Sequence, residues 1–192
     1  MSYSFIKRCL IGAGISFWSM ATICILLYPE VFQHYEYGVS YFGSVSATTI
    51  PYYLGFALTI TFTLLVACRL WRISQPLSTA FWSLAVCMSG VAITSYSLND
   101  MVYAIHWAFA IALTICILVT AFWLVKQGKL AWVDYLLIGL IFATVVISAL
   151  PVIHHIPVIK IYIPRELLVF TSSLWLLGRA ALKVATQAKS AG

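Results

Sequence analysis

The sequence predicts an all-α membrane protein: a six-transmembrane-helix bundle with both termini in the cytoplasm. Of its 192 residues, 63% are hydrophobic and 8% are charged, whereas a soluble domain has about 25% charged residues. A bilayer core about 30 Å thick requires about 20 apolar residues per helix. Six such stretches and their short connections use almost the whole chain, so we expect a single transmembrane domain over residues 1–192.

The charges between the stretches separate by sign, which sets the expected orientation. One side carries nine basic residues: Lys7, Arg8, Arg69, Arg72, Lys126, Lys129, Arg179, Lys183 and Lys189. The other side carries Lys160 and Arg165, together with Glu30, Glu36, Asp100, Glu166 and all four histidines. Cytoplasmic loops are rich in Lys and Arg, so the basic side is predicted to be cytoplasmic. Aromatic belts agree: Trp71, Trp82, Trp123 and Trp132 map to the inner boundary, and Tyr35, Tyr37, Tyr41, Tyr52, Tyr53, Tyr96, Tyr103 and Tyr162 map to the outer one.

The helix boundaries are predicted from prolines, caps and basic residues. The first span follows a basic pair and lacks an A-x-A cleavage site, so it is interpreted as a retained signal anchor. Pro51 falls in the first turn of the second span, where its missing N–H costs little, and residues 75–78 are expected to form a turn. Asn99 or Asp100 is a candidate N-cap of the fourth span, and Pro151 closes the fifth. The six spans are residues 9–28, 50–70, 79–96, 101–125, 130–150 and 165–182.

Two outer segments are expected to cover the mouth of the bundle. Residues 29–49 form the longest and most polar connection. Residues 151–164 carry three prolines among aliphatic residues, a composition that disfavours a regular helix. Because the second segment is too apolar to face water, we expect the two segments to pack against each other.

The spans carry no charged residue near their middle, which disfavours several functions. Pumps, transporters and voltage sensors need ionisable groups within the membrane. Asp134 lies at the inner end of the fifth span, near Lys126 and Lys129, and is interpreted as half of a surface ion pair. The hydroxyl groups within the spans are expected to bond carbonyls of their own helix or to bridge helices. The formal charge of +6 arises at helix ends that meet lipid headgroups, so no nucleic-acid partner is expected.

The candidate ligand-binding residues belong to the outer side. His106 lies about one and a half turns inside the fourth span, where an imidazole is costly unless it has a partner or lines a wet cavity. Two interpretations stay open: a hydrogen bond between helices, or one wall of an outward-opening pocket, with Tyr103 on the same helical face. Arg165 could hold a lipid phosphate, and Glu166 could orient that Arg or meet a cationic headgroup. The full candidate set is His106, Asp100, Tyr103, His154, His155, Arg165, Glu166 and Ser40.

The chain contains no fixed metal-binding motif. Zinc needs three or four converging ligands; His106 with His154 or His155 and a carboxylate would suffice in kind, but no spacing brings them together. A bis-histidine haem needs two histidines at matching depth, and only His106 lies inside a span. The five cysteines show no C-x-x-C spacing and are expected to be free thiols. No cofactor is therefore required, and zinc is the option that stays open.

The first outer loop and the second span resemble part of a known family. The segments are Tyr28-Pro29, Tyr37-Gly38-Val39-Ser40-Tyr41-Phe42-Gly43 and Thr49-Ile50-Pro51-Tyr52-Tyr53-Leu54-Gly55-Phe56. They are similar to small six-span proteins of the Frag/DRAM/Sfk type, in which a Tyr-Pro closes span one and an (Ile/Val)-Ser-x-x-Gly motif follows. The resemblance implies a lipid-related protein, here in the plasma (inner) membrane of a prokaryote. It carries over no catalytic residue, and Tyr41 stands where the family usually has an acid.

Three functional hypotheses follow. In the first, the chain binds or organises lipid, or a membrane-protein partner, at the outer leaflet without catalysis. In the second, it is an intramembrane lipid hydrolase or transferase with His106 and Asp100 as acid–base groups. In the third, it is a structural subunit of a membrane complex. The lack of mid-span charge and the outer polar cluster favour the first hypothesis, in which membrane lipids are the partners.

Overall fold

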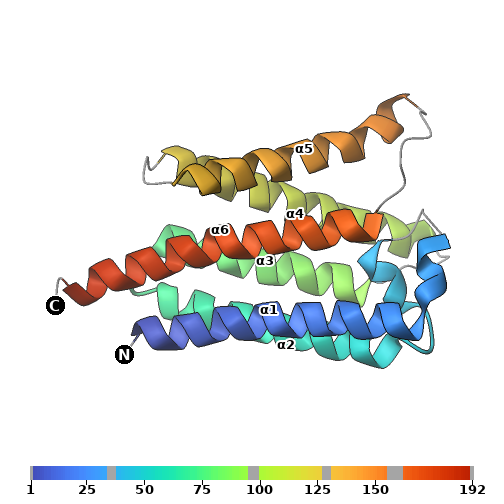
Figure 1. Ribbon diagram of the computed structural model, residues 1–192, viewed down its shortest axis with the longest axis horizontal. Coiled ribbons are helices and arrows are strands. Elements are labelled where there is room, and N and C mark those ends of the chain that lie inside the picture. Colours follow the sequence, from blue (N-terminus) through green and yellow to red (C-terminus); the bar gives the residue numbers. More distant parts are fainter. Residues whose placement is uncertain (1, 34–37, 95–99, 127–130, 155–161, 191–192) are drawn as a thin grey trace.

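In the part of the chain that the structure describes, six long helices form a bundle (Figure 1). The computed structural model describes the backbone of residues 2–33, 38–94, 100–126, 131–154 and 162–190, and the side chains of residues 3–31, 38–94, 101–126, 131–146 and 163–188. Every regular element within these ranges is a helix, which confirms the all-α class. The elements are α1 (Ser2–Leu27), the 3-10 helices η1 (Pro29–Gln33) and η2 (Val39–Gly43), α2 (Thr49–Leu70), α3 (Gln75–Ile93), α4 (Asp100–Lys126), α5 (Trp132–His154) and α6 (Tyr162–Ser190).

The helix lengths are consistent with an integral membrane protein. Within the described residues, α1, α2, α3, α4 and α6 each contain a segment long and apolar enough to cross a membrane. The fifth helix contributes a shorter apolar stretch, Trp132–Val146, inside a helix of 23 residues. In water, helices this apolar would need a second layer of protein around them. A lipid bilayer accommodates them without such a layer.

The helices pack in chain order, and α6 closes the bundle. α1 lies against α2, α2 against α3 and α3 against α4, while α6 packs on both α1 and α5. α5 forms the edge of the bundle opposite α1 and α2 (Figure 1). The beginning of α1 and the end of α6 lie at the same end of the bundle (Figure 1), as six helices of alternating direction require.

Two clusters of buried apolar side chains hold the helices together. The first includes Leu70 of α2, Leu77 of α3 and Leu177 of α6. The second lies at the opposite end, where Phe42 of η2 joins Tyr52 of α2 and residues of α1, α3 and α6. This second cluster places η2 in the core of the bundle rather than on its surface.

Two glycines allow α1 and α2 to approach closely. A Cβ atom at Gly55 would lie 2.2 Å from the Cβ of Met20, and one at Gly12 would lie 2.8 Å from the Phe62 ring. Gly12 thus thins α1 where it meets the Phe62 ring of α2. At Gly14 a Cβ atom would be only in ordinary contact with Leu174, at 3.4 Å. Small residues at a helix interface let backbones pack closely in lipid.

The outer surface of the helices is apolar. Leu26, Ile50, Ile93 and Phe122 have exposed fractions between 72% and 78%, and similar residues recur along all six helices. Soluble monomers rarely expose apolar patches larger than a few hundred Å². Lipid tails, rather than water, are the medium that such a surface fits.

Several helices extend beyond the predicted spans. α1 begins at Ser2 and α6 continues to Ser190, because a helix does not have to end where the hydrocarbon ends. α3 begins at Gln75 with Pro76 in its first turn, so the predicted turn over residues 75–78 is wrong. In the first turn of a helix a backbone N–H has no acceptor within the helix, so a proline there costs no hydrogen bond.

The proline-containing segment 151–164 is more helical than predicted. α5 continues through Pro151 to His154, and α6 begins at Tyr162, so that Pro164 falls in its first turn. The expectation that this segment forms no regular helix is therefore wrong at both of its ends. Pro164 lies in the first turn of α6, where its missing N–H has no acceptor within the helix. Pro151 lies three residues before the end of α5, so only the last turn follows it.

The described charges separate along the bundle axis, as the sequence predicted. The basic end, where α1 begins and α2, α4 and α6 end, carries Lys7, Arg8, Arg69, Arg72, Lys126, Arg179 and Lys183. Glu30, Arg165 and Glu166 belong to the opposite end. Trp71 and Trp132 are exposed at the basic end, whereas Tyr53 and Tyr103 are exposed at the other.

Candidate functional site

A short cap closes the end of the bundle opposite the basic end. The cap comprises residues 38–48, that is, η2 and the turn into α2. Val39 and Phe42 are buried against the helices, with 4% and 0% of their surfaces exposed. Thr48 is also fully buried, and its hydroxyl donates to the Phe42 carbonyl at 2.6 Å. The cap is thus folded on itself and is part of the core.

Glu166 ties the cap to α6. The Val39 N–H donates to Oε2 of Glu166 at 2.6 Å, across 127 positions of sequence. The approach depends on Gly38, because a Cβ atom there would lie 2.3 Å from Oε1 of the same carboxylate. The sequence suggested that Glu166 orients Arg165 or meets a cationic headgroup. In the structure its carboxylate holds the backbone of the cap, with the half-buried Arg165 as a neighbouring charge.

Tyr52 lies beneath the cap and has no exposed surface. Its ring centroid is 4.8 Å from that of Phe56 and 5.1 Å from that of Tyr53. Its hydroxyl interacts electrostatically with Glu166, but no hydrogen-bond partner for it lies in the described part of the chain. An unpartnered buried hydroxyl costs roughly 1–3 kcal/mol. The prediction that Tyr52 belongs to an outer aromatic belt is wrong, because it faces the core beneath η2.

Ser40 and Tyr41 are half-buried on η2. Burial, and then the hydrogen bond of the Tyr41 hydroxyl to Tyr28, raise the pKa of Tyr41 above its ordinary value, so this phenol stays protonated at neutral pH. The Ser44 hydroxyl donates to the Tyr41 carbonyl at 2.7 Å. These contacts of Tyr41 hold η2 in place. Ser40 lies in the same short helix.

His106 is buried between α3 and α4, with 8% of its surface exposed. Its Nδ1 lies 3.4 Å from the hydroxyl oxygen of Thr94. Thr94 directly follows the last residue of α3, so this contact joins His106 of α4 to the end of α3. Of the two open interpretations, this contact supports the hydrogen bond between helices.

The prediction that Tyr103 shares the buried face of His106 is wrong. Tyr103 is 40% exposed, and its ring pairs with that of Trp107 at a centroid distance of 6.2 Å. Three residues turn a helix by about 300°, and α4 packs so that this rotation brings Tyr103 to the outer surface. Tyr103 therefore does not share a buried pocket wall with His106.

Thr94 is not arranged as a nucleophile that His106 could activate. The Thr94 hydroxyl donates to the Gly90 carbonyl at 2.6 Å. With that proton committed, Thr94 can only accept from His106, so Nδ1 of His106 is the donor. A general base must instead accept the proton of the nucleophile. The pair is arranged to join two helices.

Three candidate side chains lie outside the described residues. These are the side chains of Asp100 and His154 and the whole of His155. Residues 155–161 also lie outside the described residues. They make up half of the segment 151–164, which is predicted to pack on the outer loop 29–49. The part that is described agrees with that prediction in one respect, because Ile163 at the start of α6 is buried in one cluster with Val31, Val39 and Phe42.

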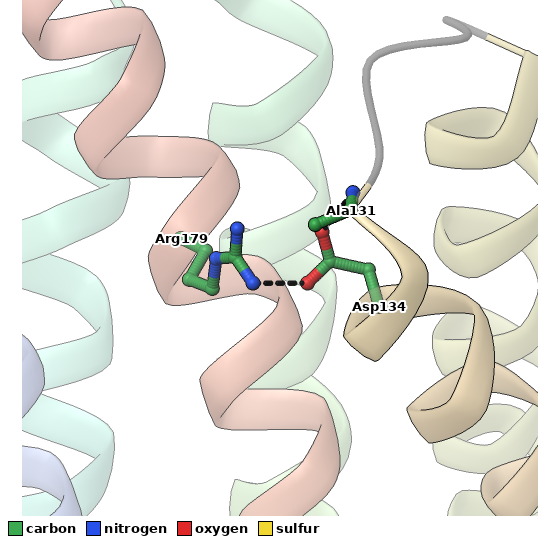
Figure 2. Close-up of polar contacts among 3 residues, drawn as sticks. All are labelled: Ala131, Asp134 and Arg179. Atoms are coloured by element: carbon green, nitrogen blue, oxygen red, sulfur yellow. Dashed lines mark hydrogen bonds and ion pairs between the residues drawn. The ribbon is translucent and has the colours of Figure 1, made fainter.

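Asp134 forms an ion pair with Arg179 of α6. Its Oδ1 lies 2.9 Å from Nη1 of Arg179 on α6, and its Oδ2 accepts the Ala131 N–H at 2.9 Å (Figure 2). The Asp134 side chain is only 5% exposed. The interpretation of Asp134 as half of a surface ion pair is wrong, because its side chain is buried against α6 and caps the start of α5; Lys129 lies outside the described residues. An acid three positions after an N-cap is a known sequence signal for the start of a helix. That signal predicts the contact with the Ala131 N–H, but it does not predict the ion pair with Arg179.

Most span hydroxyls bond carbonyls of their own helix, as predicted. The donors four residues after their acceptors are Thr59, Thr61, Thr63, Ser89, Thr94, Thr114, Thr120, Thr171 and Ser173. Ser78 of α3 instead donates to the Ala67 carbonyl of α2 at 2.7 Å. Among the described residues no three His, Cys, Asp or Glu side chains form a cluster that could hold a metal ion.

Comparison with protein-family models, curated proteins and solved structures finds no match to this chain. The resemblance of its first loop and second span to Frag/DRAM/Sfk-type proteins therefore stays a prediction. The functional argument consequently depends on the geometry of the bundle and its cap.

Proposed function

We propose that the chain is a six-span integral membrane protein with cytoplasmic termini that organises lipid at the outer leaflet, without catalysis. At 23 residues, α5 is long enough to cross a core about 30 Å thick, which supports a sixth span. The basic end supports a cytoplasmic location for the termini, because Lys and Arg accumulate on that side. The capped end then faces outward.

Labelling with a membrane-impermeant thiol reagent tests this orientation. Ser46 of the cap and Thr186 of α6 are both exposed, and each is replaced by Cys in a Cys68→Ser background, because Cys68 is an exposed native cysteine. In intact cells the reagent is expected to label Ser46→Cys but not Thr186→Cys, and permeabilised cells should give both. Labelling of Thr186→Cys alone would contradict the orientation, and labelling of both in intact cells would contradict the span count.

An exposed aromatic pair at the capped end is the observation that carries the lipid proposal. Tyr103 and Trp107 are 40% and 45% exposed, and their rings pack edge-to-face. Exposed Tyr53, Ile93 and Met101 belong to the same end of the bundle. Tyr and Trp favour the level of the lipid headgroups, where one part of the ring is apolar and the other polar. This surface suits phospholipid at the outer leaflet.

Native mass spectrometry of the protein from mild detergent tests the lipid proposal. The protein is expected to retain phospholipid, and the double substitution Tyr103→Ala/Trp107→Ala should lower the retained amount severalfold. Trp175→Ala is the matched control, because Trp175 is 57% exposed but lies near the middle of the bundle on α6. Equal lipid retention in both variants would contradict a lipid contact at the capped end.

The same preparations distinguish lipid binding from lipid hydrolysis. Because His106 donates to the end of α3, His106→Gln is expected to leave the retained lipid chemically unchanged, as in the native protein. Release of fatty acid or headgroup by the native protein, abolished in His106→Gln, would contradict a non-catalytic function and support the hydrolase hypothesis.

A further inference from the structure

The basic end of the bundle carries more positive charge than its acids balance. Among the described residues, seven Lys and Arg side chains belong to this end, and Asp134 is the single acid. Two of the cations, Arg179 and Lys183, lie four positions apart on α6 and therefore on one face of that helix. Both are exposed, and the Cβ atoms of residues so spaced are about 5–6 Å apart. One anionic group can therefore contact both side chains.

Arg179 is held in one direction by Asp134. Its Nη1 lies 2.9 Å from Oδ1 of Asp134, and the Ala131 N–H fixes the other carboxylate oxygen. Figure 2 shows that the second terminal nitrogen of Arg179 points away from the carboxylate. The Arg179 side chain is 43% exposed, although the Asp134 side chain is only 5% exposed. A guanidinium has five N–H donors, so its exposed part can donate to a further acceptor while the ion pair stays intact.

This pair lies at the expected level of the lipid headgroups. Asp134 is two residues, or about 3 Å along the helix axis, inside Trp132 at the start of α5. Trp132 and Tyr135 are 76% and 47% exposed, and exposed Trp and Tyr favour the membrane–water interface. Arg179 shares the level of Asp134, and Lys183 lies about 6 Å nearer to the basic end. This depth favours a lipid phosphate over an acidic segment of a soluble protein, which would meet the helix ends first.

The chemistry of the pair favours an anionic phospholipid. Arg binds phosphate oxygens through paired N–H groups, and Lys adds a point charge. Arg179 balances the charge of Asp134, so Lys183 leaves the site with a net positive charge. A zwitterionic headgroup would bring its own cation against this charge, whereas a glycerol headgroup would not. Because Asp134 already orients Arg179, less side-chain freedom is lost when a phosphate binds.

We propose that Arg179 and Lys183 bind the phosphate of an anionic phospholipid in the leaflet at the basic end, with Asp134 as a positioning residue. Basic sites between transmembrane helices bind anionic headgroups in the same way. The inference goes beyond the proposed function, because it concerns the opposite end of the bundle and a headgroup of stated charge. It requires only that the bundle lies in a bilayer.

Native mass spectrometry in mild detergent with equimolar phosphatidylglycerol and phosphatidylcholine tests the proposal. The native protein is expected to retain severalfold more phosphatidylglycerol. Lys183→Met, which removes one cation, should lower this preference severalfold. Arg179→Lys should lower it as well, because a point charge replaces the planar guanidinium while the charge opposite Asp134 is kept. Arg72→Met is the matched control, since it removes an exposed cation from the same end but next to α2, which packs on α1 and α3; its preference should equal that of the native protein.

Four outcomes would overturn the inference. The first is equal retention of the two lipids by the native protein. The second is a loss in Arg72→Met as large as in Lys183→Met, which would mean that the whole basic end attracts anionic lipid without a site. The third is full preference in Arg179→Lys, which would exclude the guanidinium as the phosphate ligand. The fourth is displacement of phosphatidylglycerol by inorganic phosphate at the same concentration, which would retain a phosphate site but overturn the lipid as its ligand.

Two further comparisons keep the test specific. Lys183→Met changes an exposed side chain and keeps the ion pair of Arg179 with Asp134, so it tests the site even if Arg179→Lys does not fold. The double variant Tyr103→Ala/Trp107→Ala should keep the native preference for phosphatidylglycerol, because its substitutions lie at the capped end. Failure of the lipid contact at the capped end and failure of this site are therefore separate results.

Discussion

Replacing Gly55 by Ala is expected to destabilise the packing of α1 on α2 by about 1–3 kcal/mol, as overpacking a close contact does. The new Cβ would lie 2.2 Å from the Met20 Cβ and 2.5 Å from its Cγ. Because the Met20 Cβ is fixed to the backbone of α1, no rotation of that side chain relieves the clash. The two helices must separate, and reversible unfolding in SDS measures the free energy that is lost.

Gly139→Ala is the matched control for this substitution. A Cβ atom at Gly139 of α5 meets nothing within 4 Å, so the only expected effect is the gain of about 0.5–1 kcal/mol from removing a glycine inside a helix. Both changes add one methyl group to an apolar helix, and they should act in opposite directions. If Gly55→Ala stabilised the protein as Gly139→Ala does, the close approach of α1 and α2 would be contradicted.

The helices were predictable because in lipid each span must satisfy its own backbone hydrogen bonds. Apolar length and basic flanks therefore located all six helices, and the separation of charges along the bundle followed from the same signals. The boundaries failed near Pro76, Pro151 and Pro164. The general rule treats proline as a helix breaker, but Pro76 and Pro164 lie in the first turns of α3 and α6, where the missing N–H has no acceptor within the helix. Pro151 lies three residues before the end of α5, and the sequence pattern placed that end too early.

The candidate site was less predictable because its contacts join distant parts of the chain. Burial of His106 could be inferred from the cost of an imidazole in lipid, but its partner Thr94 depends on how α4 rotates against α3. The hydrogen bond from Val39 to Glu166 uses a backbone donor, which leaves no signature in the sequence. Gly38 was the available signal, since a glycine in a loop can mark a close approach. Tyr52 could not be assigned to the core before the position of the cap was known.

Removing the charge of Arg179 is expected to have the largest effect at the basic end. Arg179→Met keeps most of the apolar stem but leaves Asp134 without its ion-pair partner. Because the Asp134 side chain is 5% exposed, the stranded carboxylate should cost about 3–5 kcal/mol, as for other broken buried pairs. Asp134→Ala should cost less, about 1–2 kcal/mol for the lost cap at Ala131, since Arg179 is 43% exposed and regains water.

This asymmetry can be tested with a double-mutant cycle measured by SDS unfolding. The double variant Asp134→Ala/Arg179→Met should be more stable than Arg179→Met alone, because no buried charge is left without a partner. Lys126→Met is the control, since it removes an exposed cation from the same end of the bundle and should change stability by less than about 0.5 kcal/mol. Equal losses in Asp134→Ala and Arg179→Met would mean that the pair behaves as a solvated surface contact. The predicted asymmetry instead follows from Asp134 being held between the first turn of α5 and the side of α6 (Figure 2), where its charge depends on Arg179.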